Sequence, residues 1–314
     1  MPEALIVGGG VSGLSCGIRL LEAGFGARIW ARDMPLQTVS NTAAAVWYPF
    51  KAYPEHLVVG WSRTTYDELL RLQPDPAAGI FMRPGHEVFP WPVDEPWWRE
   101  AVPSYRRITP AELPAGYVDG YVFEAPVIEM PIYLRYLLAR FEQLGGTIEQ
   151  HALSSLAPAL AESALVVNCS GLGARELVGD GSVFPIRGQV VRVAQLGLET
   201  FLLDDHGPGG ITYIIPRGSD CVLGGTVDEG SEDLAADPAT AEAIMARSIF
   251  FEPRLAQATV LEHKVGLRPG RPTVRLEAEQ PAPGQRLIHN YGHGGAGVTL
   301  SWGCADEVAR LALV

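Results

Sequence analysis

The sequence is poor in features typical of disulfide-rich or metal-binding proteins. It has four cysteines in 314 residues, no CxxC pair, and no cysteine at metal-ligand spacing from a histidine. We therefore expect no metal site and four small buried thiols in a reduced, cytoplasmic compartment, with a disulfide as the weaker alternative. The four are Cys16, Cys169, Cys221 and Cys304.

Basic blocks and long apolar runs are also missing. Only 24 residues are basic against 36 acidic ones, a net charge of −12, which argues against nucleic-acid or anionic-membrane partners. No run of about 18 apolar residues suggests a membrane span. The start, MPEALIVGGG, lacks the basic region of a secretory signal, and the final LALV is not a peroxisomal address. The negative net charge does not exclude a zwitterionic substrate, because one arginine can set the electrostatic field inside a cavity.

What is present is enough apolar sequence, 47%, to build about two domains. Residues 4–7 form a short apolar run suited to a buried parallel strand, and a glycine turn follows at 8–13. Residues 14–23 have helical spacing, with Gly24 placed as a C-terminal cap, and 27–31 read as the next strand.

Further along, proline- and tryptophan-rich sequence at 73–130 favours short strands and turns. We expect helices at 132–144, 238–250 and 301–313, strands at 147–150 and 165–169, and β structure over 186–227. The simplest fold is α/β: a Rossmann-like nucleotide-binding domain of discontinuous segments with an inserted β-rich (α+β) substrate domain. The boundaries we predict are 1–54, 131–181 and 272–314 for the first domain, and 55–130 and 182–271 for the second.

The spacing GxGxxG appears at Gly8, Gly10 and Gly13, directly after a strand and at the start of a helix. Side chains there would keep a pyrophosphate from the N–H groups and dipole of the helix N-terminus. The turn therefore predicts dinucleotide binding, against the alternative of an ordinary glycine-rich turn. At the end of the second strand, Asp33 suits a ribose, whereas Arg32 would suit the 2′-phosphate of NADP.

Three further segments suggest contacts to a flat ring system. Small residues at 41–49 would let the backbone lie against a ring, although a plain alanine-rich turn fits as well. A second glycine turn at 168–173 ends an apolar strand. A third, at 289–299, leads into the last helix and would bring N–H groups to the electron-rich edge of a flavin. In that segment His293 is a candidate base, but a structural hydrogen bond is the favoured interpretation.

Two side chains are candidates for binding a carboxylate. Arg268 lies between Leu267 and Pro269, and a buried guanidinium needs an anion, either a substrate carboxylate or an internal acid. Tyr213 precedes an Ile-Ile-Pro run, and its hydroxyl is a second candidate donor, although a strand tyrosine usually packs in a core.

Taken together, the segments resemble the D-amino acid oxidase family of flavoproteins, the fungal members more than the mammalian ones. The matching stretches run in order along nearly the whole chain: VGGGVSGLS, NTAAAVWYPF, VVNCSGLGA, RGQVVRV, YIIPRGSDCVLGGT, VGLRPGRPTVRLE and HNYGHGGAGVTLSWGCA. The resemblance implies non-covalent FAD and a small D-amino acid substrate clamped over the flavin, with Arg268 and Tyr213 on its carboxylate and the Gly295 carbonyl on its amine. It also implies cofactor contacts at Gly8, Gly10, Val11, Ser12, Gly13, Arg32, Asp33, Ser40, Ala44, Ala45, Val46, Leu153, Ser170, Arg268, Gly294, Gly295, Ala296, Gly297, Val298 and Thr299.

The activity implied is hydride transfer from the alpha carbon to flavin N5, which needs positioning more than a general base. Molecular oxygen would then be reduced to hydrogen peroxide, and the imino acid would hydrolyse to a 2-oxo acid and ammonia. The chain departs from mammalian members where Gly209 and Ala296 replace tyrosines, so the lid at 207–210 is short and glycine-rich.

We expect neutral D-amino acids as substrates in D-amino acid catabolism. A D-aspartate oxidase, with Arg217 as second cation, a glycine or sarcosine oxidase, and an NADP-linked dehydrogenase are the alternatives. A homodimer stays open.

Overall fold

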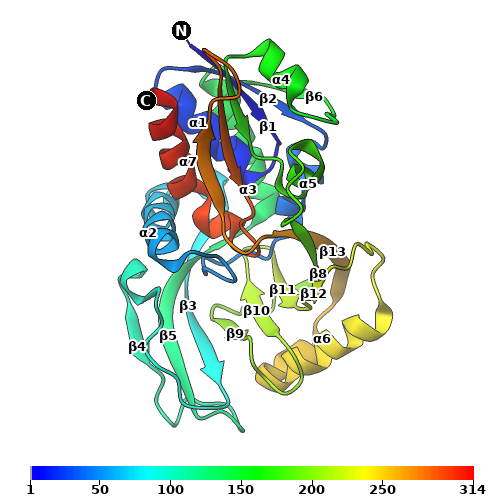
Figure 1. Ribbon diagram of the computed structural model, residues 1–314. Helices are drawn as coiled ribbons and strands as arrows, with labels where there is room; N and C mark the ends of the chain where they lie inside the picture. Colours follow the sequence, from blue (N-terminus) through cyan, green and yellow to red (C-terminus); the bar gives the residue numbers. More distant parts are fainter. Residues whose placement is uncertain (1) are drawn as a thin grey trace.

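The computed structural model describes residues 2–314, which form two bodies, each built around its own β-sheet. In Figure 1 the upper body contains the six-stranded sheet and both chain ends, and the lower body contains the nine-stranded sheet. The predicted α/β class, with a Rossmann-like part and a β-rich part, is therefore confirmed.

The six-stranded sheet has the order β14-β15-β7-β1-β2-β6. Its strands are β1 (Glu3–Val7), β2 (Gly26–Ala31), β6 (Thr147–Gln150), β7 (Leu165–Asn168), β14 (Arg275–Glu279) and β15 (Arg286–Tyr291). All neighbours are parallel except β14 with β15. Parallel pairing brings the carboxyl ends of β1, β2 and β7 to one edge, where a nucleotide binds in folds of this type.

Helices cover both faces of this sheet, which explains why β1 is apolar throughout. Ala4 and Ile6 of β1 belong to the large core cluster, whereas Leu5 and Val7 pack on the opposite side with Leu156. The helices of the upper body are α1 (Val11–Glu22), α2 (Glu55–Leu72), α3 (Met130–Gln143), α4 (Ala157–Glu162), α5 (Ala174–Leu177) and α7 (Gly297–Leu313).

The nine-stranded sheet has the order β12-β8-β11-β10-β9-β3-β5-β4, with β13 paired to β8. Every pairing is antiparallel except that of β3 with β9. Its strands are β3 (Ile80–Phe89), β4 (Tyr105–Arg107), β5 (Asp119–Ile128), β8 (Phe184–Ala194), β9 (Phe201–Asp204), β10 (Thr212–Pro216), β11 (Asp220–Gly224), β12 (Asp228–Glu229) and β13 (Val260–Gly270). Helix α6 (Pro238–Phe251), capped by Asp237, covers one face through Ala241 and Ile244.

Short 3₁₀ helices complete the connections: Pro35–Gln37, Val39–Thr42, Pro76–Ala78, Arg99–Ala101, Gly171–Gly173 and Pro253–Gln257. None of the helices in the described range 2–314 is long and apolar enough to cross a membrane.

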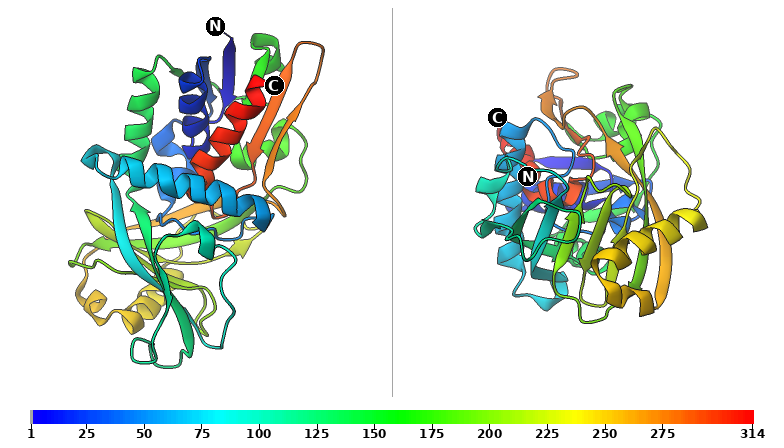
Figure 2. Two further views of the ribbon diagram at one scale, coloured as in Figure 1. Left: turned by 90° about the vertical axis from the view of Figure 1, so that its left-hand side faces the viewer. Right: turned by 90° about the horizontal axis from the view of Figure 1, so that it is seen from below.

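Most expected elements agree with the structure to within a few residues. Strands β13, β14 and β15 and helices α2 and α4 were not predicted. The proline-rich segment forms two ten-residue strands, β3 and β5, that are longer than expected, because they pair along their whole length. Helix α2 packs against α7 and lies across the boundary between the two bodies in the left view of Figure 2. The domain boundaries themselves stay a prediction.

Candidate active site

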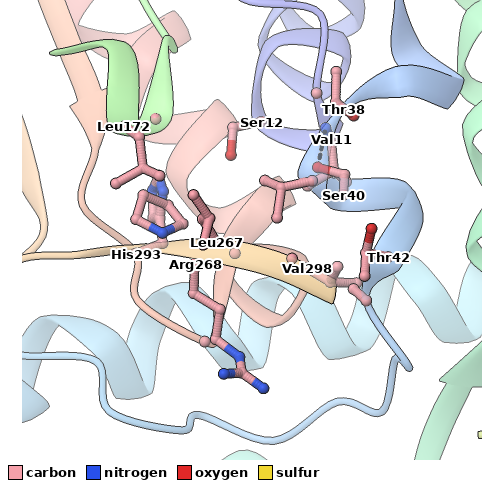
Figure 3. A pocket seen from close by; sticks show the side chains of 18 of the residues that line it. Val11, Ser12, Thr38, Ser40, Thr42, Leu172, Leu267, Arg268, His293 and Val298 are labelled. Carbon is pink, nitrogen blue, oxygen red and sulfur yellow. Dashed lines mark hydrogen bonds between the residues drawn. The ribbon is translucent and has the colours of Figure 1, made fainter. Parts of the chain in front are cut away.

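A cavity of about 780 Å³ lies between the two bodies and brings together segments from the whole chain. Its walls come from the turn after β1, the end of β2, residues 37–48, the turn after β7, strands β10 and β13, and the start of α7. Figure 3 shows Arg268 extending from β13 away from Val11 and Ser40. The glycine turn and the Arg268 side chain therefore lie at different ends of the cavity.

The predicted site residues converge on this cavity with two exceptions, Gly13 and Ala296. Those that line it are Gly8, Gly10, Val11, Ser12, Arg32, Asp33, Ser40, Ala44, Ala45, Val46, Leu153, Ser170, Tyr213, Arg268, Gly294, Gly295, Gly297, Val298 and Thr299. Ala296 is fully buried behind the wall, where it precedes the first turn of α7. Gly13 acts through packing, because a Cβ there would lie 1.9 Å from the Gly8 carbonyl oxygen.

The first glycine turn is shaped for close approach of a ligand to α1. Gly8 has φ +119°, and a Cβ on it would lie 2.4 Å from the carbonyl oxygen of Cys169. The Val11 N–H donates to Ser40 Oγ over 3.1 Å, the dashed contact in Figure 3, so Ser40 anchors the next segment at the helix N-terminus. N–H groups and helix dipole there favour a phosphate.

At the β2 end of the cavity, the exposed Arg32 pairs with Asp33 at 2.8 Å, so the two candidates for the ribose are joined to each other. Trp30 and His151 also line this end and stack with ring centroids 4.3 Å apart. This stack was not predicted from the sequence, because Trp30 lies on β2, His151 directly follows β6, and the two residues meet only through the β2–β6 pairing.

The segment before α7 provides the opposite wall. Gly294 has φ +56° and passes close to the backbone of Lys51, and the first turn of α7 presents free N–H groups to the cavity. His293 is buried, its Nε2 lies 2.9 Å from Asn290 Oδ1, and burial lowers its pKa to about 4. A neutral histidine held by an asparagine supports the structural interpretation over the catalytic one.

Arg268 and Tyr213 lie side by side at the other end of the cavity. Within the described chain no carboxylate forms an ion pair with Arg268, and its NH1 donates to the Thr226 carbonyl over 3.1 Å. The internal acid considered as the alternative partner is thus not found. Burial raises the pKa of Tyr213, and the adjacent Arg268 charge opposes that effect. An unpaired guanidinium beside a protonated hydroxyl is complementary to a carboxylate.

Close packing against glycines sets the positions of both side chains. A Cβ on Gly188 would lie 2.4 Å from Arg268 NH1, and one on Gly224 would lie 2.0 Å from the Tyr213 ring. Strands β8 and β11 therefore need glycine at these positions to leave room for the two carboxylate-binding groups.

Arg217, the second cation considered for an acidic substrate, forms an ion pair inside the protein. Arg217 is 2% exposed, pairs with Asp220 at 2.6 Å, donates to the Ala44 carbonyl and does not line the cavity. Its guanidinium stabilises the turn between β10 and β11 and the backbone next to it. The chain therefore offers no buried partner at Arg217 for a side-chain carboxylate.

Several cavity residues were missed by the sequence analysis, above all Tyr48 and Asp205. Tyr48 donates its hydroxyl to Glu87 Oε1 over 2.6 Å. Asp205 follows β9 and faces the cavity near Arg268 and Lys51. An aspartate in a polar turn carries no local signal of this kind, since its placement depends on how β9 pairs with β3 and β10.

The fold and its glycine-lined cavity are those of the FAD-dependent oxidoreductases. The sequence profile of the family described as FAD dependent oxidoreductase matches residues 3–311. A glycine oxidase structure from Geobacillus kaustophilus superimposes with a TM-score of 0.81 at 19% identity, covering 100% of this chain and 95% of that one, which is a likeness of fold.

Similar proteins of known name place the chain more narrowly within these oxidoreductases. The chain is 56% identical over 311 residues to the D-amino-acid oxidase of Rubrobacter xylanophilus, covering 99% of this chain and 95% of that protein. It is 41% identical to the D-amino-acid oxidase of Dictyostelium discoideum (98% and 90% covered) and 37% identical to the D-aspartate oxidase of Homo sapiens (98% and 93% covered). This chain belongs to the D-amino acid oxidase family of FAD-dependent oxidoreductases.

Family membership confirms FAD as the cofactor, and the glycine turns at 8–13 and 294–297, which a Cβ would partly fill, fit such a group. Non-covalent attachment stays a prediction.

Proposed function

We propose that the chain oxidises neutral D-amino acids to 2-oxo acids with release of ammonia and hydrogen peroxide. The observation that carries the proposal is the unpaired Arg268 beside Tyr213 in the cavity that also contains the glycine turns. A carboxylate bound there lies at the end of the cavity away from the pyrophosphate turn, where a flavin ring would be within reach.

In this proposal the chain's own residues act by positioning. Arg268 and Tyr213 bind the substrate carboxylate, and the carbonyl of Gly295 accepts a hydrogen bond from the amine. The glycine turns at 8–13 and 294–297 would hold FAD, which would supply an acceptor for the hydride of the alpha carbon and a route for the electrons to molecular oxygen. With its carboxylate and amine both held, the substrate can direct its side chain only toward the apolar wall of Ile211 and Leu203. This restriction selects the D enantiomer.

The proposal is tested by purifying the protein, recording the flavin spectrum, and following peroxide release with D-alanine, L-alanine, glycine and sarcosine. We expect turnover of D-alanine well above the other three. Faster turnover of glycine or sarcosine than of D-alanine would make the glycine-oxidase alternative the better description. A reduced compartment such as the cytoplasm suits the four free buried cysteines.

Removing the Tyr213 hydroxyl is expected to weaken substrate binding more than turnover. The Tyr213→Phe variant keeps the ring that packs on Gly224 and loses one hydrogen bond, worth about 1–2 kcal/mol. The kinetic constants for D-alanine should show a several-fold rise in KM with kcat nearly unchanged. A loss as large as that caused by removing Arg268 would show that the hydroxyl takes part in the chemical step.

Substrate scope is expected to favour neutral side chains over acidic ones. Arg217 is paired inside the protein, so a side-chain carboxylate would enter a cavity without a buried cation to receive it. We expect kcat/KM for D-valine, D-alanine and D-phenylalanine to exceed that for D-aspartate, with graded differences of about 1–3 kcal/mol among the neutral ones. If D-aspartate ranks first, the chain is instead a D-aspartate oxidase.

A further inference from the structure

A second cavity of about 720 Å³ adjoins the first on the side of the lid. The two cavities share four lining residues: Tyr48, Phe50, Asp205 and Ile211. Asp205 thus stands at the junction, where a substrate side chain leading away from Arg268 would pass from the inner cavity into the outer one.

The Asp205 carboxylate has no partner in the described chain 2–314: neither a hydrogen bond nor an ion pair engages it. Its neighbour Asp204 differs, because it accepts from the Tyr117 hydroxyl at 2.6 Å and from the His206 N–H at 3.3 Å. Lys51 pairs with Glu229 at 3.0 Å, and Arg268 faces the carboxylate site. Arg247, a third cation that lines the outer cavity, donates to the backbone carbonyls of Ile211 and Gly225. Burial raises the pKa of Asp205 to about 7, which Asp204 reinforces and Lys51 and Arg268 oppose.

We propose that Asp205 determines side-chain specificity: it binds the cationic end of long D-amino acids such as D-arginine and disfavours acidic side chains. The inference rests on the proposed function and assigns the residue that recognises a basic side chain. The end of the inner cavity that binds the substrate then has a cation, Arg268, for the carboxylate and an anion, Asp205, at the junction with the outer cavity for a basic side chain.

The length of the substrate side chain determines whether it reaches the Asp205 carboxylate. Short neutral chains are expected to end inside the inner cavity, beside apolar residues such as Leu203, before they reach the junction at Asp205. A chain of arginine length extends toward the junction, and its guanidinium supplies the charge-assisted hydrogen bonds that the carboxylate lacks. A D-glutamate side chain brings a second negative charge to the same place. The outer cavity gives the longer chains room.

The test compares D-arginine with D-citrulline, which has nearly the same shape and no charge. In the wild type we expect kcat/KM for D-arginine to exceed that for D-citrulline. In Asp205→Asn it should fall about tenfold or more for D-arginine, stay within about twofold for D-citrulline and D-alanine, and rise for D-glutamate. The matched control is Asp228→Asn, which removes the same charge from an exposed outer-cavity residue that pairs with Arg187. This control should leave the ratio of D-arginine to D-citrulline unchanged.

Binding gives a second readout that does not depend on turnover. The guanidinium compound 5-guanidinopentanoate, which has the chain length of arginine, should raise the Tm of the wild-type holoprotein more than neutral 5-ureidopentanoate does, and the difference should vanish in Asp205→Asn. The inference is wrong if Asp205→Asn lowers all substrates equally, which would place Asp205 at the alpha-amine, or if Asp228→Asn has the same effect. Turnover of D-alanine with no selectivity change in Asp205→Asn overturns this inference alone, whereas no peroxide from any D-amino acid overturns the proposed function.

Discussion

Replacing Arg268 by alanine is expected to leave FAD bound and to lower kcat/KM for D-alanine by about a hundredfold or more. The reason is that Arg268 has no carboxylate partner inside the described chain, so its charge is available to the substrate. A charge-assisted bidentate contact in a desolvated site is worth on the order of 3 kcal/mol. The flavin absorbance per mole of protein and the steady-state constants, measured on one preparation, separate loss of cofactor from loss of substrate binding.

A matched control lies three residues away on the same chain. Arg271 pairs with Asp180 at 3.0 Å and does not line the cavity, so Arg271→Ala should keep its kcat/KM per bound flavin. Arg268→Lys should recover only part of the activity, because an ammonium cannot make two parallel hydrogen bonds to a carboxylate. Near-normal kcat/KM in Arg268→Ala would show that the substrate carboxylate binds elsewhere.

The parts of the site that could be predicted are those where local chemistry is restrictive. The glycines at 8 and 13 were identifiable because a strand, a tight turn and a helix follow one another within a few residues. In the structure a Cβ at either position would meet backbone at 2.4 Å or less. Arg268 stood out because a guanidinium in weakly charged sequence needs an anion.

The parts that could not be predicted depend on contacts between distant segments. Asp205 reaches the cavity from the residue after β9, and nothing near it in the sequence indicates a site. Tyr48 lies in the predicted segment 41–49, but its hydrogen bond to Glu87 on β3 joins segments far apart in the sequence. Arg217 was open to prediction: it lies three residues before Asp220 across a short turn, and that spacing makes an internal ion pair the simplest expectation. Helix α2 was missed because its buried face includes the polar residues Ser62, Thr65 and Glu68, which interrupt the apolar periodicity.

The contribution of one buried carboxyl on β3, that of Glu87, to the free energy of unfolding is expected to fall as pH rises from about 4.5 to about 8. Glu87 is 4% exposed, its Oε1 accepts from Tyr48, and its Oε2 has no partner in the described chain. Burial raises the pKa of Glu87 to about 8, with the Tyr48 hydrogen bond opposing and the Asp205 charge reinforcing the shift.

The direction of this change in stability with pH follows from proton binding. An unfolded chain loses this proton near pH 4.5, whereas the folded protein keeps it until about pH 8, so between those values the folded state binds more protons and loses stability with rising pH. The interval corresponds to about 5 kcal/mol for complete titration. Buried His293 acts in the opposite direction, because its folded pKa of about 4 makes stability rise with pH toward neutrality.

Comparison with Glu87→Gln isolates the Glu87 contribution, because the amide keeps an acceptor for Tyr48 and cannot ionise, while His293 is common to both proteins. With FAD in excess, unfolding free energies from urea titrations at pH 5, 6, 7 and 8 should show the variant gaining on the wild type at each step, by several kcal/mol between the extremes. The exposed Glu124→Gln on the paired strand β5 should show no such trend. Parallel wild-type and Glu87→Gln curves would mean that the carboxyl is ionised in the folded protein and that a cation or water compensates for its burial.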